Sequence, residues 1–314
     1  MMLHKMLGIK YPIIQGAMAN IATAQFAACV SNHGGLGIIG TGAMPVEVAR
    51  ESIRKCKELT DKPFGVNVMM MHPQTKEMME MIAQEKVAVV TTGAGNPGVY
   101  VPMLKESGAL IIPVVASVAL ARRLEQSGVD ALIVEGCEAG GHVSEQTTMA
   151  LLPQVIDAVN IPVIAAGGIG DGRGLYAALS LGAIGVQVGT CLLASVECPI
   201  HENYKQAVIK AKDTDTVVTG KSLNSPVRIY KNAMSRQYLK LEKEAANREE
   251  LEKLTLGALR KAVFEGDIKN GSVMMGQIAG LVREVRPMKE ILEDMMQGAY
   301  KVHQKMMETM KEIA

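Results

Sequence analysis

The chain has 314 residues, of which 48% are hydrophobic and 21% are charged, enough for one barrel-sized domain or two smaller ones. Lysine and arginine together number 33 and aspartate and glutamate 32, which leaves a net charge of +1. This balance and the absence of tryptophan argue against a basic or aromatic surface for nucleic acid.

The cysteines and the apolar segments indicate the cellular compartment in which the protein is expected. Five cysteines without a CxxC pair are typical of a reducing environment and argue against a structural zinc site. The first residues, MMLHKMLGIKYP, lack the apolar core of a signal peptide, and no uncharged apolar stretch reaches the ~18 residues of a membrane span. We therefore expect a soluble cytoplasmic protein with no metal centre and no membrane partner.

Short apolar segments alternate with helix-like segments along most of the chain. The segments are bounded by turn residues and are apolar on both faces, as in a parallel sheet covered by helices. The predicted strands are residues 12–18, 36–40, 64–69, 87–93, 110–115, 131–136, 162–168 and 185–190. Between them, helices are predicted over residues 47–59 and 117–128, the second with Ser117 as its N-cap and Gly128 at its end.

Eight such units predict the α/β class and a TIM (β/α)8 barrel rather than an open sheet. The alternation stops after residue 212, so we expect the barrel to comprise residues 1–213 and 286–314. Residues 214–285 are predicted to form a small helical cap beside the barrel mouth, with a charged amphipathic helix within 240–263. The last helix, residues 288–313, is expected to pack against the barrel.

Two consecutive strand ends near residues 165–190 are rich in glycine. AAGGI (165–169) and QVGT (187–190) would end the seventh and eighth strands, where barrels commonly bind phosphate through backbone N–H groups and a helix N-terminus. Gly167 and Gly168 would let an anion approach the chain, and Thr190 would add a hydroxyl group. Ordinary tight turns are the alternative reading of the same glycines.

Other strand ends carry polar groups that suggest a flat, polar-edged cofactor across the barrel top. QGAM (15–18) ends the first strand, and TTGAGNP (91–97) ends the fourth. Asn67 lies within the third strand, where a polar side chain is costly without a partner. The alternative for Asn67 is an internal hydrogen bond across the barrel.

In EGCEAGGH (135–142), carboxylate, thiol and imidazole side chains occur where the sixth predicted strand ends. Gly140 and Gly141 would bring backbone close to a ligand, and His142 would project from the loop. Because imidazole titrates near neutrality, His142 is the candidate for proton transfer. Glu135 could orient a loop amide, a cofactor hydroxyl or the imidazole, whereas Cys137 is expected to be packed rather than nucleophilic.

With these motifs the chain closely resembles the FMN-dependent enoyl-(acyl-carrier-protein) reductase II family of bacterial fatty-acid synthesis. It is also similar to the related nitronate monooxygenases, once called 2-nitropropane dioxygenases. The shared motifs are YPIIQGAMA (11–19), GGLGIIG (34–40), KPFGVN (62–67), VTTGAGNP (90–97), EGCEAGGH (135–142), IPVIAAGGIGDG (161–172) and GVQVGT (185–190). PVRIYKN (226–232) and GSVMMGQIAGLV (271–282) look more like the reductase.

The resemblance implies FMN as cofactor, NADH or NADPH as reductant and, in some members, activation by a monovalent cation. It implies a substrate carried by acyl carrier protein, and we expect a homodimer. The expected cofactor-binding residues are Gly16, Ala17, Met18, Asn67, Thr92, Gly93, Glu135, Gly140, Gly141, Gly167, Gly168, Gln187, Gly189 and Thr190. The cap is expected to contact substrate through Met274, Met275 and Gln277, unless these residues only pack. Many reductases have QGGMAW where this chain has QGAMAN, so Ala17 and Asn20 alter the cofactor-side wall.

The implied reaction is the reduction of a trans-2-enoyl thioester, with hydride passing from NAD(P)H to flavin N5 and on to the β-carbon. His142 would protonate the α-carbon or polarise the thioester oxygen. A nitronate monooxygenase would use the same histidine on a nitroalkane α-proton and O2 as the oxidant. A non-catalytic flavin or phosphate-ligand binder would keep the glycines and make His142 incidental.

Overall fold

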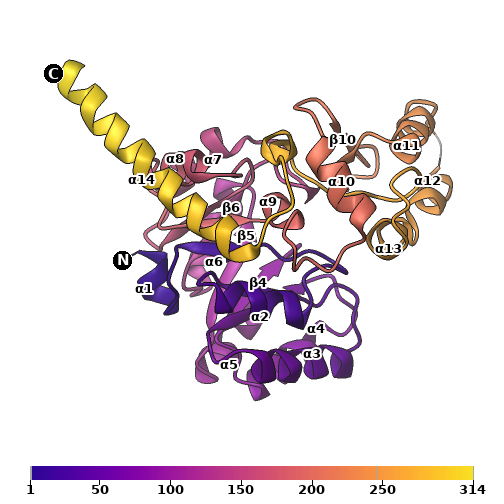
Figure 1. Cartoon of the computed structure of the whole chain (residues 1–314). Coiled ribbons are helices and arrows are strands. Elements are labelled where there is room, and N and C mark those ends of the chain that lie inside the picture. Colours follow the sequence, from indigo (N-terminus) through magenta and orange to yellow (C-terminus); the bar gives the residue numbers. More distant parts are fainter. Residues whose placement is uncertain (1, 246, 314) are drawn as a thin grey trace.

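A closed barrel of parallel strands lies at the centre of the computed structural model, which describes residues 2–245 and 247–313 (Figure 1). The strands are β1 (Ile13–Gln15), β2 (Gly37–Gly40), β3 (Phe64–Met69), β4 (Val89–Gly93), β5 (Leu110–Val115), β6 (Leu132–Glu135), β8 (Val163–Ala166) and β9 (Val186–Val188). They form an 8-stranded sheet in the order β1-β9-β8-β6-β5-β4-β3-β2, and a parallel bridge between Ile14 and Leu36 joins its two ends. The predicted barrel is therefore confirmed, with all of its predicted strands.

The side chain of Gln15 links β1 to β2, at the point where the barrel closes. Its Nε2 donates to the carbonyls of Gly16 and Ile38 at 2.9 and 3.1 Å, and its Oε1 accepts from the Ile38 N–H at 3.2 Å. Gln15 is fully buried, so these bonds satisfy a polar group that would otherwise be costly. This residue holds the barrel closed rather than facing a ligand.

Helices follow the strands and surround the barrel. They are α1 (Leu3–Leu7), α2 (Ala24–Asn32), α3 (Val46–Leu59), α4 (Thr75–Gln84), η1 (Gly98–Tyr100), α5 (Val101–Glu106), α6 (Val118–Gln126), α7 (Thr148–Ile156), α8 (Gly172–Ser180), α9 (Thr190–Leu193), α10 (Glu202–Lys210) and α14 (Met288–Ile313). Side chains cap several of them: Ser117 accepts from the Leu120 N–H, as predicted, and Asp171 accepts from Arg173 and Gly174. These caps satisfy N–H groups that a helix start leaves free.

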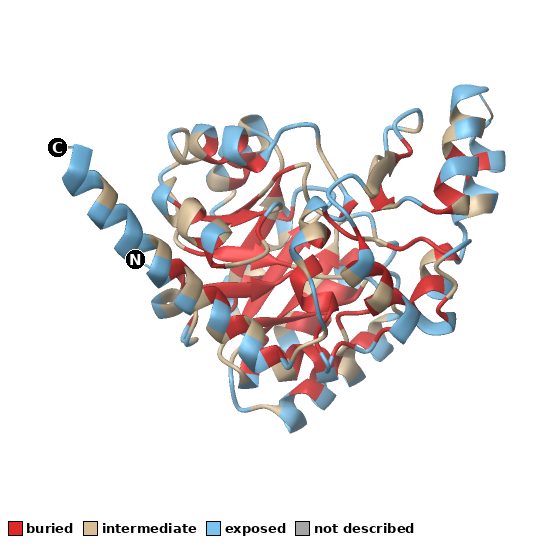
Figure 2. Cartoon of the chain, turned by 45° about the horizontal axis from the view of Figure 1, so that its top comes forward, coloured by how far each residue is buried: buried red, intermediate tan, exposed pale blue. Residues whose placement is uncertain are grey.

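The hydrophobic core has two layers, shown in red at the centre of Figure 2. Inward-facing strand residues such as Ile38, Ile112 and Ile164 fill the barrel, and Leu3 and Leu7 of α1 pack against them. A larger layer lies between the strands and the surrounding helices. Because these described side chains fill the barrel interior, a ligand on the barrel axis is expected beyond the strand ends.

The last helix, α14, packs on α8, as expected, and then continues past the body of the protein (Figure 1). A Cβ atom added at Gly172 would collide with the backbone of Gly298 and Ala299, so glycine at this position allows the two helices to touch. The carboxyl-terminal part of α14 is mostly exposed in Figure 2. Among the described residues, no helix combines the length and the apolar character that crossing a bilayer requires.

The predicted cap contains strands as well as helices. Its helical parts are α11 (Ala233–Lys243), α12 (Arg248–Thr255), α13 (Ala258–Arg260), η2 (Lys261–Glu265) and η3 (Gln277–Leu281). β10 (Thr216–Thr219) and β11 (Val227–Tyr230), which the sequence analysis did not predict, form a three-stranded antiparallel sheet with β7 (Gly141–His142). The cap is thus joined through its sheet to the segment that carries His142.

Candidate active site

A cavity of about 630 Å³ opens at the carboxyl ends of the barrel strands, beneath the cap. Its wall includes residues at or just after the ends of β1, β4, β6, β8 and β9, which is the face where TIM barrels hold their active sites. The cap contributes a second wall through Asn224, Pro226, Leu259, Met274 and Ile278. Both parts of the chain therefore shape one cavity.

One end of the cavity is lined by the backbone of the glycine-rich segments after β8 and β9. Gly167 and Gly168 adopt left-handed φ angles of 86° and 72°, which glycine accepts without strain. Gly189 precedes the short helix α9, and the Thr190 hydroxyl accepts from the Gly276 N–H at 2.8 Å while keeping its own proton to donate. None of the described residues that line the cavity is lysine or arginine. An anion at this end would be held by backbone N–H and hydroxyl groups.

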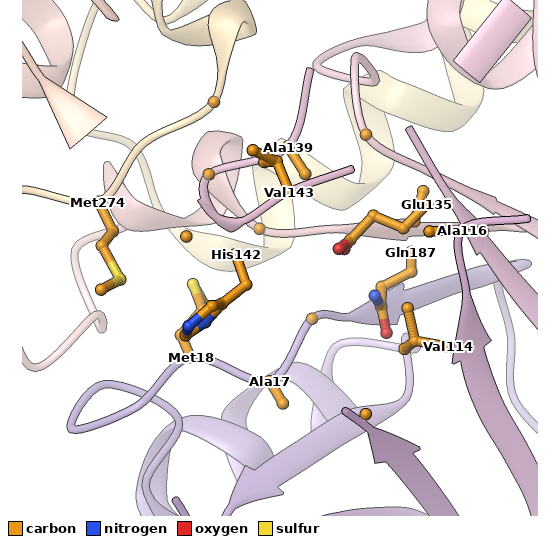
Figure 3. A pocket seen from close by; sticks show the side chains of 18 of the residues that line it. Ala17, Met18, Val114, Ala116, Glu135, Ala139, His142, Val143, Gln187 and Met274 are labelled. Atoms are coloured by element: carbon orange, nitrogen blue, oxygen red, sulfur yellow. The ribbon is translucent and has the colours of Figure 1, made fainter. Parts of the chain in front are cut away.

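A second part of the wall carries polar side chains on neighbouring strands. Glu135 is in register with Ala166, which is in register with Gln187, so the small alanine leaves room between two long side chains. Figure 3 shows Glu135 and Gln187 on the same side of the cavity, near Val114 and Ala116. Burial raises the pKa of Glu135 to about 7, because its charged form loses hydration.

Asn67 lies on the cavity wall as well, and its amide is partly engaged. Its Nδ2 donates to the Thr91 hydroxyl at 3.0 Å, across the β3–β4 pair. The two sequence-based readings of Asn67 therefore coexist: it has an internal hydrogen bond, and it also faces the cavity.

His142 lies on the other side of the cavity from Glu135 in Figure 3, near Met18 and Met274. Its backbone belongs to β7, and Val227 of β11 is its partner in register. The surrounding protein removes part of the hydration of the ring, which lowers the pKa of His142 below its usual value. At neutral pH the imidazole is therefore mainly neutral, with one N–H to donate and one nitrogen to accept.

Glu138 is a site residue that sequence reasoning missed. Its carboxylate accepts from the Thr148 N–H at 2.9 and 3.0 Å and from the Thr148 hydroxyl at 3.0 Å, at the start of α7. A negative charge at a helix N-terminus is favourable. The carboxylate also borders Gly168, since a Cβ atom added there would lie 3.4 Å from Glu138 Oε1. The available signal was its place in EGCEAGGH, three residues after Glu135 and two before Gly140.

Most of the predicted residues line the cavity. They are Gly16, Ala17, Met18, Asn67, Gly93, Glu135, Gly140, Gly141, His142, Gly167, Gly168, Gln187, Gly189, Thr190 and Met274. The structure therefore brings together groups from seven separate motifs of the sequence.

Three predicted residues do not line the cavity. Thr92 is fully buried and follows Thr91, whose side chain points inward to Asn67, so strand alternation turns Thr92 toward the surrounding helices. Met275 is fully buried in the main core, whereas Met274 packs against the cap cluster and lines the cavity. Gln277 is exposed, and its backbone N–H, not its side chain, donates to the Glu138 carbonyl at 2.9 Å.

Comparisons with known proteins agree over the length of the chain. The sequence profile of the nitronate monooxygenase family matches residues 1–84 and 75–298. The structure of FabK from Thermotoga maritima is similar, with a TM-score of 0.95 and 47% identity over 98% of each chain. A probable nitronate monooxygenase from Staphylococcus saprophyticus is 33% identical, covering 89% of this chain and 92% of that one. A 5-hydroxy-7a-methyl-1-oxo-octahydro-1H-indene-4-carboxyl-CoA dehydrogenase from Mycobacterium tuberculosis is 30% identical over 95% of each chain.

Proposed function

The chain belongs to the nitronate monooxygenase family, and on that premise we propose that it is an FMN-dependent enoyl-(acyl-carrier-protein) reductase that uses NADH or NADPH. The observation that carries this proposal is the likeness to FabK, an enoyl-(acyl-carrier-protein) reductase II, at a TM-score of 0.95 and 47% identity over 98% of the chain. The likeness includes the cap, where the sequence motifs also favour the reductase.

The residues present fit FMN. The cavity volume of about 630 Å³ is in the range of cofactor sites. Gly167, Gly168, Gly189 and Thr190 would hold the phosphate group through backbone N–H and hydroxyl donors. Ser144 also lines the cavity, and its buried hydroxyl has no hydrogen-bond partner among residues 2–245 and 247–313, so a bound ligand would give it one.

When bound, FMN supplies the redox step, taking a hydride from NAD(P)H and giving it to the β-carbon of a trans-2-enoyl thioester. The protein must then position the substrate and deliver a proton to its α-carbon. His142 holds one donor N–H on the cavity wall and is the group assigned to this task. Glu135 and Gln187 would contact the cofactor from the opposite side.

The substrate is proposed to be a thioester carried by acyl carrier protein, with its acyl chain against the cap. Residues 214–285 act in this proposal as the substrate segment, and residues 1–213 and 286–314 as the cofactor barrel. Apolar side chains from both parts line the cavity, among them Met18, Leu259, Met274 and Ile278. Met274 is therefore retained as a substrate contact, whereas Met275 and Gln277 are not.

Nitronate oxidation with O2 is the second candidate, because the family and one of the similar proteins carry that activity in their names. Assays of the same purified protein with the two substrates distinguish the reductase from the monooxygenase. Purified protein loaded with FMN should oxidise NADH or NADPH when crotonyl thioester is added under nitrogen, with K⁺ and Na⁺ compared in parallel. Turnover of propionate 3-nitronate in air, without turnover of the thioester, would overturn the reductase assignment. If neither substrate reacts while FMN stays bound, the protein is a flavin-binding protein without either activity.

We also propose a homodimer formed through the projecting part of α14. Its exposed apolar residues are Met306, Met307, Met310 and Ile313. Met306, Met310 and Ile313 recur at helical spacing and therefore lie along one face, on which the same face of a second copy would pack. Met310→Glu should weaken the dimer in sedimentation experiments, and Met310→Leu should preserve it. An unmodified protein that sediments as a monomer would contradict the proposal.

A further inference from the structure

Arg228 of β11 is buried, although its guanidinium group makes no salt bridge among the described residues. It is 7% exposed, and burial lowers the pKa of the guanidinium group. Nε donates to the Cys137 carbonyl at 3.0 Å, and Nη1 donates to the Thr216 hydroxyl at 3.1 Å. The Glu138 carboxylate is near enough to favour the charged guanidinium, but it accepts hydrogen bonds from Thr148 and forms no salt bridge with Arg228, so burial of this charge calls for an explanation beyond packing.

The same residue holds both ends of one short segment. Its side chain binds the carbonyl of Cys137, at the start of the segment, and its backbone pairs with Gly141, next to His142. Val227, the preceding residue, pairs with His142 itself. Residues 137–142 are thus closed into a loop whose two ends are fixed by one arginine and its strand.

The rest of the cap reinforces this arrangement. The Val143 N–H donates to the Pro226 carbonyl at 3.1 Å, just before β11. On the other side of the loop, a Cβ atom added at Gly140 would lie 2.6 Å from the Met275 carbonyl carbon, so the cap backbone touches the loop directly. The position of the His142 ring in the cavity therefore depends on where β11 holds the loop.

We propose that Arg228 is a positioning residue, which fixes the loop of residues 137–142 so that His142 faces the substrate. This inference rests on the proposed role of His142. Arginine suits the task because its planar group presents several donors in fixed directions and reaches two acceptors at once. Lysine could reach one of these oxygens but would not hold both in one plane.

The test compares three variants. Arg228→Met keeps the length of the side chain and removes its donors, Arg228→Lys keeps the charge, and Thr216→Val removes only the second acceptor. Arg228→Met should slow oxidation of the reduced, FMN-loaded protein by crotonyl thioester by about 10²-fold, the scale expected for a misplaced catalytic group. Arg228→Lys should recover part of the rate, and Thr216→Val, which keeps the bond from Arg228 to the Cys137 carbonyl, should lose much less than Arg228→Met. FMN content should be unchanged in all three.

A double-mutant cycle separates positioning from general stability. If Arg228 acts through His142, Arg228→Met should add almost nothing to the effect of His142→Ala. Multiplying effects would overturn the proposal, and so would a Thr216→Val variant as slow as Arg228→Met, since that would indicate a general loss of cap structure. If Arg228→Met does not fold, the same cycle is measured with Arg228→Lys.

A second readout does not depend on any reaction. The imidazole pKa of His142 can be followed by NMR in cofactor-free protein, with His142→Gln identifying its signal. Arg228→Met should raise this pKa, because a loosened ring regains hydration. An unchanged pKa would overturn the positioning role. Failure of the thioester assay with a shifted pKa would instead contradict the proposed reaction and leave the positioning of His142 supported.

Discussion

Replacing His142 with alanine is expected to slow the oxidation of the reduced, FMN-loaded protein by crotonyl thioester by about 10²–10⁴-fold, the contribution typical of a positioned acid. The ring lies on the cavity wall beneath the cap, on the other side from Glu135 and Gln187. FMN content should not change, because the proposed phosphate contacts lie just after β8 and β9. Reduction by NAD(P)H should be largely preserved, since that step needs no proton from this side chain.

Anaerobic stopped-flow measurements separate the two half-reactions through the flavin absorbance. His303→Ala on α14 is the matched control, because it removes an imidazole that does not line the cavity. If His142→Ala slows only the reduction by NAD(P)H, the histidine serves nicotinamide binding. If neither half-reaction changes, His142 is a structural residue of β7.

The pH dependence shows which form of the imidazole acts. Partial loss of hydration lowers the pKa of His142, so an imidazolium donor would be most active at acid pH, and the rate would fall as pH rises through the lowered pKa. A neutral ring that only donates a hydrogen bond to the thioester oxygen would keep its rate above that pKa. Glu135 has a pKa of about 7 and adds negative charge to the cavity as it deprotonates. The profile is therefore measured in Glu135→Gln as well as in the unmodified protein.

The barrel could be predicted because each strand can be recognised from its own few residues. Short segments that are apolar on both faces, each ended by glycine or a polar residue, require no knowledge of distant contacts. The glycine-rich ends of β8 and β9 and the EGCEAGGH segment could be placed on one face for the same reason, since all strands of a parallel barrel point the same way. The sequence shows less clearly which side chains of a strand point into the barrel. Thr92 was expected at the site, but its neighbour Thr91 is the residue that points inward.

The cap could not be predicted in this way because its structure depends on distant partners. β11 pairs with β7, a two-residue strand more than eighty residues earlier in the chain, and the local sequence of neither strand reveals the other as its partner. Glu138 was missed because its role depends on Thr148, at the start of another helix. Met274 and Met275 are adjacent and chemically identical, so only the fold decides which one faces the cavity.

The pairing of β11 with β7 also suggests a physical reason why the stretch PVRIYKN favoured the reductase over the monooxygenase. Val227 and Arg228 form the strand that holds His142, and Pro226 lines the cavity. A motif specific to the reaction is expected where the cap meets His142, the group proposed to deliver the proton. Most motifs shared by both branches instead lie on the barrel, where the cofactor would bind, and EGCEAGGH runs from β6 of the barrel into β7 of the cap sheet.

Replacing Gly168 with aspartate is expected to weaken FMN binding by at least about 100-fold. The new carboxylate would stand in the proposed phosphate site and would also lie near Glu138, since the added Cβ atom is 3.4 Å from Glu138 Oε1. Two unit charges about 4 Å apart repel by roughly 4 kcal/mol at an effective dielectric constant of about 20, more than the ~2.7 kcal/mol that a 100-fold change needs. The cavity has no lysine or arginine among its described lining residues to offset this charge.

The matched control is Gly168→Asn, which has nearly the same shape without the charge. Gly168 has a φ of 72°, a region that asparagine and aspartate tolerate better than other side chains, so both variants bear a similar backbone cost. FMN affinity is measured by titrating cofactor-free protein and following flavin fluorescence, with circular dichroism as the check on folding. A much larger loss in the aspartate variant identifies an anion at this end of the cavity. Equal losses would mean that bulk alone blocks the site, and full FMN binding by a folded aspartate variant would place the phosphate elsewhere, because a carboxylate and a phosphate group cannot share the same few N–H donors.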